Sequence, residues 1–97
     1  MVELTGKQKR YLRSLGHHLE PTLMVGAKGL AEGVVQELAE SLAAHELVKV
    51  RLGPGCGVDR AEAAKGLSAA TDSAVIQILG KTLLLYRASE KAKIQLP

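Results

Sequence analysis

A tetrapeptide bounded by two glycines has the residue types of a phosphate-binding loop. Gly26 and Gly29 enclose Ala27 and Lys28, after a short apolar run and before a segment with helical spacing. Glycine allows the backbone to turn tightly and to approach a ligand closely. The first amides of the helix that follows have no partner inside that helix, and together with Lys28 they would attract an anion. The spacing therefore predicts a site for a phosphate group.

The residues of this loop alone leave two interpretations open. KH domains clamp a nucleic-acid backbone through a GxxG loop. A plain strand-to-helix turn has the same composition, and a GxxG tetrapeptide occurs by chance in many proteins. The distribution of positive charge in the rest of the chain favours the first interpretation.

Further positive charge lies on one predicted helix and one predicted strand. Helical spacing over 6–16 places an apolar seam on one side and a basic ridge on the other. Alternation over 47–52 points the two cations of that strand to the same face. We expect these side chains and Lys28 to form one continuous patch that contacts a nucleic-acid backbone. Besides the loop, the predicted RNA-binding residues are Lys7, Lys9, Arg10, Arg13, Lys49 and Arg51.

Other reactive residue types show no catalytic or metal-binding spacing. Cys56 is the only cysteine, and the three histidines form no C-x-x-C or H-x-x-x-H pattern with it. We therefore predict no catalytic residue, no metal and no cofactor, and we expect that the protein is not an enzyme. A small enzyme centred on Cys56 is the rival hypothesis.

Short-range signals define the elements that must position these residues. Thr5 and Gln8 form a capping-box pattern, so a helix is predicted to begin after Thr5. It should end at Gly16, where glycine would adopt a left-handed conformation. The predicted elements that follow are a strand over 22–25, a helix over 31–44, a strand over 47–52 and a helix over 60–70.

The last two predicted strands form a hairpin that is apolar on both faces. The pair Gly80–Lys81 suits a two-residue turn of type II′ between strands over 74–79 and 82–87, and it pairs Leu79 with Thr82. Because both faces need cover, we expect the second and third helices on one face and the first helix on the other. In this register one face carries Ile76, Ile78, Leu83 and Leu85, and the other carries Val75, Leu79, Leu84 and Tyr86.

The order of the elements predicts an α/β fold, α-β-α-β-α-β-β around a small mixed four-stranded sheet. A chain of 97 residues suits one compact domain, residues 1–97, and has no room for a second. Residues 88–97 either add an edge strand through Ile94 and Leu96 or form a loose tail. The chain has no run of about 20 apolar residues and no apolar N-terminal stretch, so we expect a cytoplasmic protein.

The charges are unevenly distributed along the chain. The net charge is +3, from 13 Lys and Arg against 10 Asp and Glu. Residues 29–48 contain four acidic residues and no basic one, whereas the segments 1–28 and 49–97 carry net charges of +3 and +4. Basic zones of this kind favour a polyanionic partner. Two tyrosines and no Phe or Trp argue against a base-stacking platform, and they favour recognition of structured RNA by shape and charge.

With these residues in place, the chain resembles the YhbY family, the stand-alone bacterial form of the CRM (chloroplast RNA splicing and ribosome maturation) domain. The likeness runs nearly end to end. Two departures stand out: Ala31 replaces the capping Thr or Ser of many family members, and the loop 53–57 is richer in glycine. The most specific matching blocks are 25–33, 45–50 and 80–87.

The resemblance implies a fold similar to the C-terminal domain of a translation initiation factor, and a KH-like GxxG loop at Gly26–Gly29. It also implies RNA binding without catalysis and a role in ribosome biogenesis on precursors of the large ribosomal subunit. We accordingly expect a monomer that binds ribosomal RNA, with no membrane and no small-molecule substrate as partner. The alternative is a protein-interaction module that docks a ribosomal protein through the acidic face of the second helix, formed by Glu32, Glu37 and Glu40.

Overall fold

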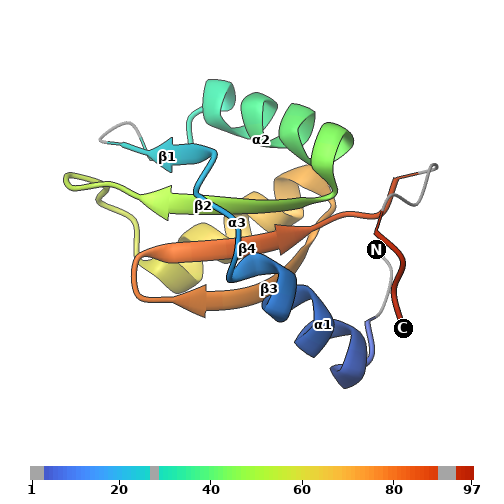
Figure 1. Ribbon diagram of the computed structural model, residues 1–97. Coiled ribbons are helices and arrows are strands. Elements are labelled where there is room, and N and C mark those ends of the chain that lie inside the picture. The colour runs from blue at the N-terminus through green and yellow to red at the C-terminus, as the bar shows by residue number, and fades with distance from the viewer. Residues whose placement is uncertain (1–3, 27–28, 90–93) are drawn as a thin grey trace.

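The computed structural model describes residues 4–26, 29–89 and 94–97. This part of the chain contains three helices and four strands in the predicted order (Figure 1). None of these helices is long and apolar enough to cross a membrane. The helices are α1 (Gly6–Gly16), α2 (Glu32–His45) and α3 (Arg60–Thr71), and the strands are β1 (Leu23–Val25), β2 (Leu47–Leu52), β3 (Ala74–Leu79) and β4 (Thr82–Tyr86).

Two of the three helices begin at residues whose side chains cap them. The backbone N–H of Gln8 donates to Oγ1 of Thr5 at 3.1 Å, and the backbone N–H of Thr5 donates to Oε1 of Gln8 at 3.0 Å. The predicted capping box is therefore confirmed. At the start of α3, the N–H of Ala61 donates to Oδ2 of Asp59 at 3.1 Å. Ala31 gives α2 no side-chain cap.

The four strands form one mixed sheet in the order β1-β2-β4-β3, which confirms the predicted α/β fold. β1 runs parallel to β2, whereas β4 runs antiparallel to both β2 and β3. β1, β2 and β3 therefore end at the same end of the sheet, next to the β3–β4 turn (Figure 1). Gly80 has φ +58° in that turn, as a type II′ turn requires, and Leu79 pairs with Thr82 as predicted.

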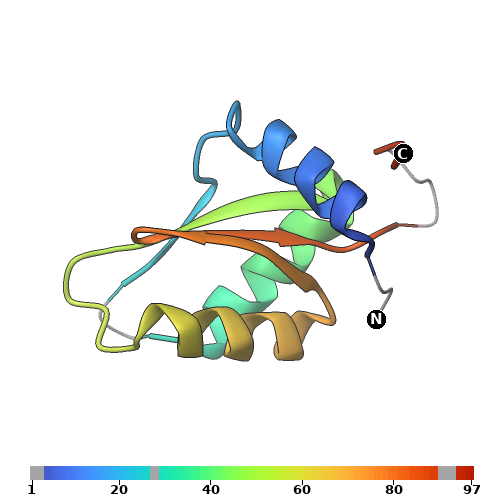
Figure 2. The same ribbon diagram turned by 90° about the horizontal axis from the view of Figure 1, so that it is seen from below.

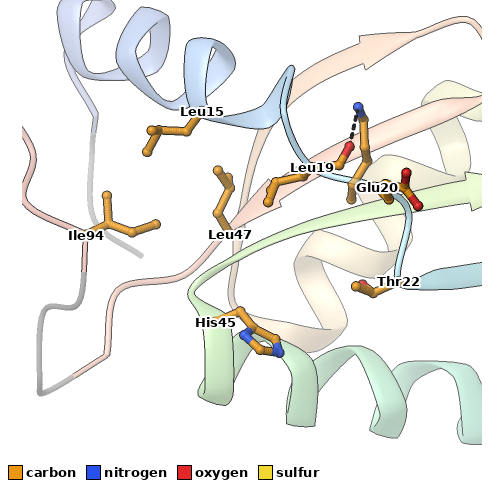
Figure 3. Close-up of a pocket in the computed structure, with 8 residues that line it drawn as sticks. Leu15, Leu19, Glu20, Thr22, His45, Leu47 and Ile94 are labelled. Carbon is orange, nitrogen blue, oxygen red and sulfur yellow. Dashed lines mark hydrogen bonds between the residues drawn. The ribbon is translucent and has the colours of Figure 1, made fainter.

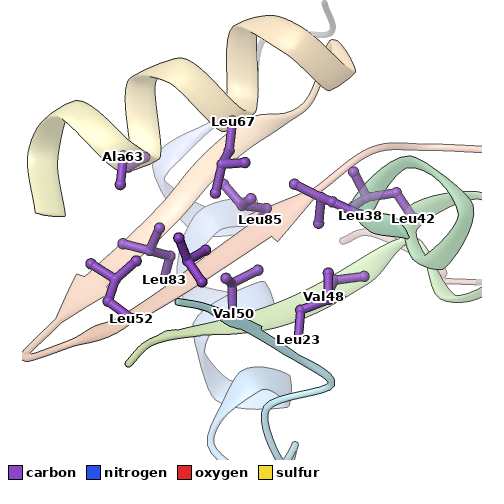
Figure 4. Close-up of a cluster of buried hydrophobic side chains, with 12 residues drawn as sticks. Leu23, Leu38, Leu42, Val48, Val50, Leu52, Ala63, Leu67, Leu83 and Leu85 are labelled. Carbon is purple, nitrogen blue, oxygen red and sulfur yellow. The ribbon is translucent and has the colours of Figure 1, made fainter. Parts of the chain in front are cut away.

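The helices cover the two faces of the sheet to different extents. α2 and α3 pack on one face around a buried cluster that includes Leu38, Leu67 and Leu85 (Figure 4). α1 packs on the other face, where Leu12 joins Leu84 in a second cluster. Figure 2 shows α1 over the part of the sheet near the start of β2, with no described helix over the part next to the β3–β4 turn. The predicted distribution of helices is confirmed, but one end of the α1 side stays open.

The predicted faces of the hairpin are wrong at its start. The register shifts between Val75 and Gln77, so β3 contains a bulge opposite β4. One extra residue reverses the alternation of side chains beyond it. Ile76 consequently joins Leu84 and Tyr86 on the α1 side, and Val75 packs against the cluster on the α2 and α3 side.

Gly16 ends α1 for a different reason than the predicted left-handed conformation. Its φ is not positive, and the cap residue His17 has φ −59°. A Cβ on Gly16 would lie 2.4 Å from Cδ2 of Leu84. The absence of a side chain therefore allows the last turn of α1 to lie directly on β4.

We expect Gly16→Ala to lower the free energy of unfolding by about 1–2 kcal/mol. Leu84 is only 3% exposed, so it has little room to move away, and the overpacking outweighs the gain in helix propensity. Urea unfolding of the single variant and of Gly16→Ala with Leu84→Val tests this account. The smaller valine should restore part of the stability. A Gly16→Ala variant as stable as the wild type would contradict the close contact.

A buried carboxylate holds the C-terminal segment. Glu46 follows α2, has φ +66° and is 0% exposed. Its Oε1 accepts from the backbone N–H of Ile94 at 2.8 Å, and its Oε2 accepts from the backbone N–H of Ser89 at 2.9 Å and from the Ser89 hydroxyl. Ile94 and Leu96 belong to no strand and pack against the cluster on the α1 side. Residues 90–93 lie outside the described residues.

Candidate nucleic-acid interface

The two glycines of the predicted loop lie at the end of the sheet where β1, β2 and β3 end. Gly26 directly follows β1. The N–H of Gly29 donates to the carbonyl of Gly26 at 3.0 Å, and Gly29 has φ +63°, so the two glycines close a tight turn. A Cβ on Gly26 would meet nothing within 4 Å, which leaves the backbone open to a ligand. Ala27 and Lys28 lie outside the described residues, so their part in the site stays a prediction.

The basic ridge of α1 borders the sheet. Three of its four cations are exposed and Arg13 is half-buried. The ridge meets β3 at a hollow of about 430 Å³, which brings arginine side chains next to a strand of the sheet. The ridge consists of Lys7, Lys9, Arg10 and Arg13, and the hollow is lined by Arg10, Arg13, Ser14, His17 and Gln77.

Lys49 and Arg51 lie on the same face of β2, but their surroundings differ. Nζ of Lys49 donates to the carbonyls of Gly16 and Leu19, each at 3.1 Å. These carbonyls lie at and just beyond the end of α1, where a cation is favourable, so Lys49 fastens the helix to the sheet. Arg51 is exposed. Of the two cations predicted on this strand, Arg51 is the one that points to solvent in the open part of the sheet.

Arg51 belongs to a row of side chains that crosses all four strands. The paired residues are Met24 with Arg51, Arg51 with Thr82, and Thr82 with Leu79. We call these four residues the cross-strand row. Met24 and Leu79 are each 59% exposed. Leu79 and Thr82 flank the β3–β4 turn, so the row lies at the end of the sheet over which Figure 2 shows no described helix. We expected a helix to cover Leu79, and that expectation is wrong.

Acidic residues are absent from the elements on this side of the sheet. Neither α1 nor any of the four strands contains Asp or Glu, and the charged residues of the strands are Lys49 and Arg51. On the opposite side, α2 presents the exposed residues Glu32, Glu37 and Glu40. The sheet thus separates a side whose helix and strands are basic, with the exposed Glu20 in the α1–β1 connection, from a side with an acidic helix face. The basic side is the one that favours a polyanionic partner.

The structure adds residues to the site that the sequence analysis did not assign to it. Met24 and Thr82 enter through their pairing with Arg51, and Gln77 enters because α1 packs beside β3. The β3–β4 turn sets one of these pairings, between Leu79 and Thr82. The other pairings depend on β2, which is distant in sequence from β4, so the periodicity of a single segment does not reveal them.

Within the part of the chain that the structure describes, neither Cys56 nor the histidine and acidic residues form a catalytic or metal site. Cys56 is half-buried, and its Sγ donates to the carbonyl of Val58 at 3.9 Å. The backbone N–H of His17 donates to the carbonyl of Arg13 and caps α1. Among the described residues, no group of three or more His, Cys, Asp or Glu is placed to hold a metal ion.

Another hollow on the α1 side, of about 530 Å³, is lined mainly by aliphatic side chains. It lies where α1, the α1–β1 connection, the start of β2 and the C-terminal segment meet (Figure 3). Leu15, Leu47 and Ile94 form much of its wall. Its lysine, Lys49, is bonded to the carbonyls of Gly16 and Leu19. These surroundings suit apolar contacts better than a phosphate group.

The fold and the interface define a class of protein: a small α/β domain with a glycine-bounded turn and a basic side that is free of acidic residues in its helix and strands. The CRS1 / YhbY (CRM) domain model matches residues 4–87 of the chain. The chain belongs to this family.

Relatives of similar length carry names that refer to RNA. An "RNA-binding protein" of Haemophilus influenzae is 45% identical, over 100% of this chain and 98% of its own length. The "Probable RNA-binding protein YqeI" of Bacillus subtilis is 42% identical, over 97% and 99%. The solution structure of SAV1595 from Staphylococcus aureus, a candidate RNA-binding protein, superposes with a TM-score of 0.82 at 41% identity, over 98% of this chain and 100% of that one.

Proposed function

We propose that this protein binds structured ribosomal RNA on the α1 side of its sheet and acts on precursors of the large ribosomal subunit. The observation that carries the proposal is the charge separation across the sheet, because α1 and the four strands hold six cations and no acidic residue. Membership in the CRM family and the names of the relatives support RNA as the class of partner. The large-subunit precursor is the ligand that the resemblance to the YhbY family implies.

The RNA backbone would run from the ridge of α1 across the cross-strand row to the Gly26–Gly29 loop. Arg10 and Arg13 would pair with phosphates at the hollow beside β3. The amides at the start of α2 would donate hydrogen bonds to another phosphate beside the open backbone of Gly26, with Lys28 adding a charge. Contacts to phosphates position an RNA without reading its bases, so the sequence preference of these contacts is slight.

The proposed activity is binding without chemistry, by a monomer in the cytoplasm that needs neither metal nor cofactor. Lys49 contributes to it mainly by fixing α1 on the sheet, since its ammonium already has two carbonyl acceptors. The half-buried Cys56 has no part in it. A Cys56→Ser variant is accordingly expected to bind RNA as the wild type does.

The double variant Lys28→Glu with Gly29→Asp tests the loop as a phosphate clamp. We expect its affinity for ribosomal RNA fragments to fall at least about tenfold, because the loop loses a cation and gains two negative charges. The dependence of the affinity on salt should also weaken, by about 0.7–0.9 in the logarithmic slope for each phosphate that the variant no longer binds. Circular dichroism and thermal unfolding establish that the variant is folded.

A control variant with the same change in net charge isolates the position of the charges. Lys65→Glu changes the charge by −2 and Ala61→Glu by −1, which together equal the −3 of the loop variant. Both positions are exposed on α3, on the other side of the sheet. The control should bind as the wild type does. If the loop variant and the control bind equally well, the loop is only a turn and the clamp is disproved.

A further inference from the structure

The cross-strand row borders a hollow that the proposed phosphate contacts do not use. The hollow has a volume of about 370 Å³ and opens beside the start of β1, where the α1–β1 connection enters the sheet. Met24 forms one wall and lies against Gly53, where a Cβ would be only 2.6 Å from its Sδ atom. The glycine thus provides the space that the Met24 side chain occupies. The hollow is lined by Pro21, Thr22, Leu23, Met24 and Arg51.

The composition of the row differs from that of a surface that contacts phosphates alone. Met24 and Leu79 are each 59% exposed, whereas Leu23 and Leu84 on the neighbouring parts of the sheet are buried. A phosphate gains nothing from a thioether or an aliphatic side chain. A nucleobase has apolar faces and polar edges, and an arginine guanidinium stacks on such a face. The chain has two tyrosines and no Phe or Trp. The guanidinium of Arg51 can therefore supply the stacking surface for a base that aromatic side chains supply in other RNA-binding proteins.

We propose that the hollow and the cross-strand row hold an unpaired base of the bound RNA, with Arg51 and Met24 contacting its faces and Leu79 contacting the strand at the far end of the row. This inference rests on the proposed function, and it adds a requirement for an unpaired nucleotide. Neighbouring strands lie about 4.8 Å apart, so the row extends about 14 Å from β1 to β3. An RNA strand that crosses it would connect the loop with the hollow beside α1.

Charge complementarity favours RNA over a second copy of the chain on this surface. A symmetric dimer formed through the row would bring Arg51 near the same residue of its partner, and like charges in contact disfavour such an interface. The flanking α1 ridge would add further repulsion, since its four charged side chains are all basic. An RNA strand brings phosphates to these cations and a base to the apolar side chains.

Two hairpin RNAs test the inference, one with a single unpaired bulge nucleotide and one with the bulge deleted. We expect Met24→Ala and Arg51→Lys each to weaken binding of the bulged RNA roughly tenfold. Binding of the fully paired RNA should change less than about twofold in both variants, because Arg51→Lys keeps the charge and Met24 contacts no phosphate. Ile78→Ala is the matched apolar control, since Ile78 is partly exposed on the opposite face of the sheet and should affect neither RNA.

The outcomes separate this inference from the proposed function. If the wild-type protein binds both RNAs equally and the variants weaken neither, the base site is disproved while RNA binding stands. Equal weakening of both RNAs would show that the row contacts only the backbone, which also overturns the base site. If the wild-type protein binds neither RNA, the proposed function fails and the inference fails with it.

Discussion

A variant in which Arg10, Arg13 and Arg51 are all replaced by glutamine will bind ribosomal RNA at least about 100-fold more weakly than the wild type. A hydrogen bond to a charged group contributes about 1.5–3 kcal/mol, and each 1.4 kcal/mol changes the affinity tenfold. Arg10 and Arg13 line the hollow beside β3, and Arg51 lies in the open part of the sheet. Because the phosphates at Arg10 and Arg13 are then no longer neutralised, the logarithmic salt slope should also decrease by about 1.4–1.8.

The arginine variant lowers the net charge by 3, the same change as in Lys65→Glu with Ala61→Glu on α3. Comparison of the two in one salt series separates the position of the charges from their sum. We expect normal thermal unfolding for both, because all substituted side chains are exposed or half-buried. Equal affinity of the arginine variant and the α3 variant would show that RNA is not bound on the α1 side.

The replacement of Glu46 by alanine will lower the free energy of unfolding by about 3 kcal/mol. The carboxylate accepts from the backbone N–H groups of Ser89 and Ile94, and both donors lose this partner in the variant. The C-terminal segment also loses its attachment to the start of β2. Urea unfolding measures the loss, with the exposed Glu37→Ala on α2 as control, where we expect a change within about 0.5 kcal/mol. Equal stability of the two variants would contradict a role of Glu46 in holding the segment.

The pKa of Tyr86 reports the negative charge of the Glu46 carboxylate. Burial, and secondly the negative charge of Glu46, raise the pKa of Tyr86 above its ordinary value of 10.0. The unfolded chain therefore loses this proton at lower pH than the folded protein does, so stability is full below pH 10.0 and falls as the pH rises through the folded pKa. In Glu46→Gln the pKa should decrease towards the ordinary value while burial keeps it raised. The absorbance of tyrosinate, with Tyr86→Phe as reference, reports this change. An unchanged pKa would show that the charge of Glu46 does not reach the phenol.

The sequence predicts the elements well because their signals are local. The capping residues Thr5 and Asp59 fix two helix starts, and the alternation over 47–52 defines β2 with its cations on one face. The turn at Gly80 also fixes the pairing of Leu79 with Thr82. Each of these features depends on residues that are close in sequence.

Features that depend on contacts between distant segments could not be predicted in this way. Lys49 makes its hydrogen bonds because the end of α1 lies over β2. A lysine that the sequence predicts to bind RNA therefore holds the helix on the sheet. The bulge in β3 follows from its register with β4, and it exchanges the faces of Val75 and Ile76. The exposure of Met24 and Leu79 results from the position at which α1 ends. Strand patterns indicate which side chains share a face, but not which part of that face a helix covers.

Titration of the isotope-labelled protein with a ribosomal RNA fragment tests most directly whether RNA binds to the side of the sheet that carries α1. Amide chemical shifts in NMR spectra report the contacted residues without any substitution. We expect the largest shifts in α1, at the ends of β1 and β2, around Gly26 and Gly29, and in the β3–β4 turn. Shifts confined to the outer face of α2, around Glu32, Glu37 and Glu40, would contradict binding on the α1 side.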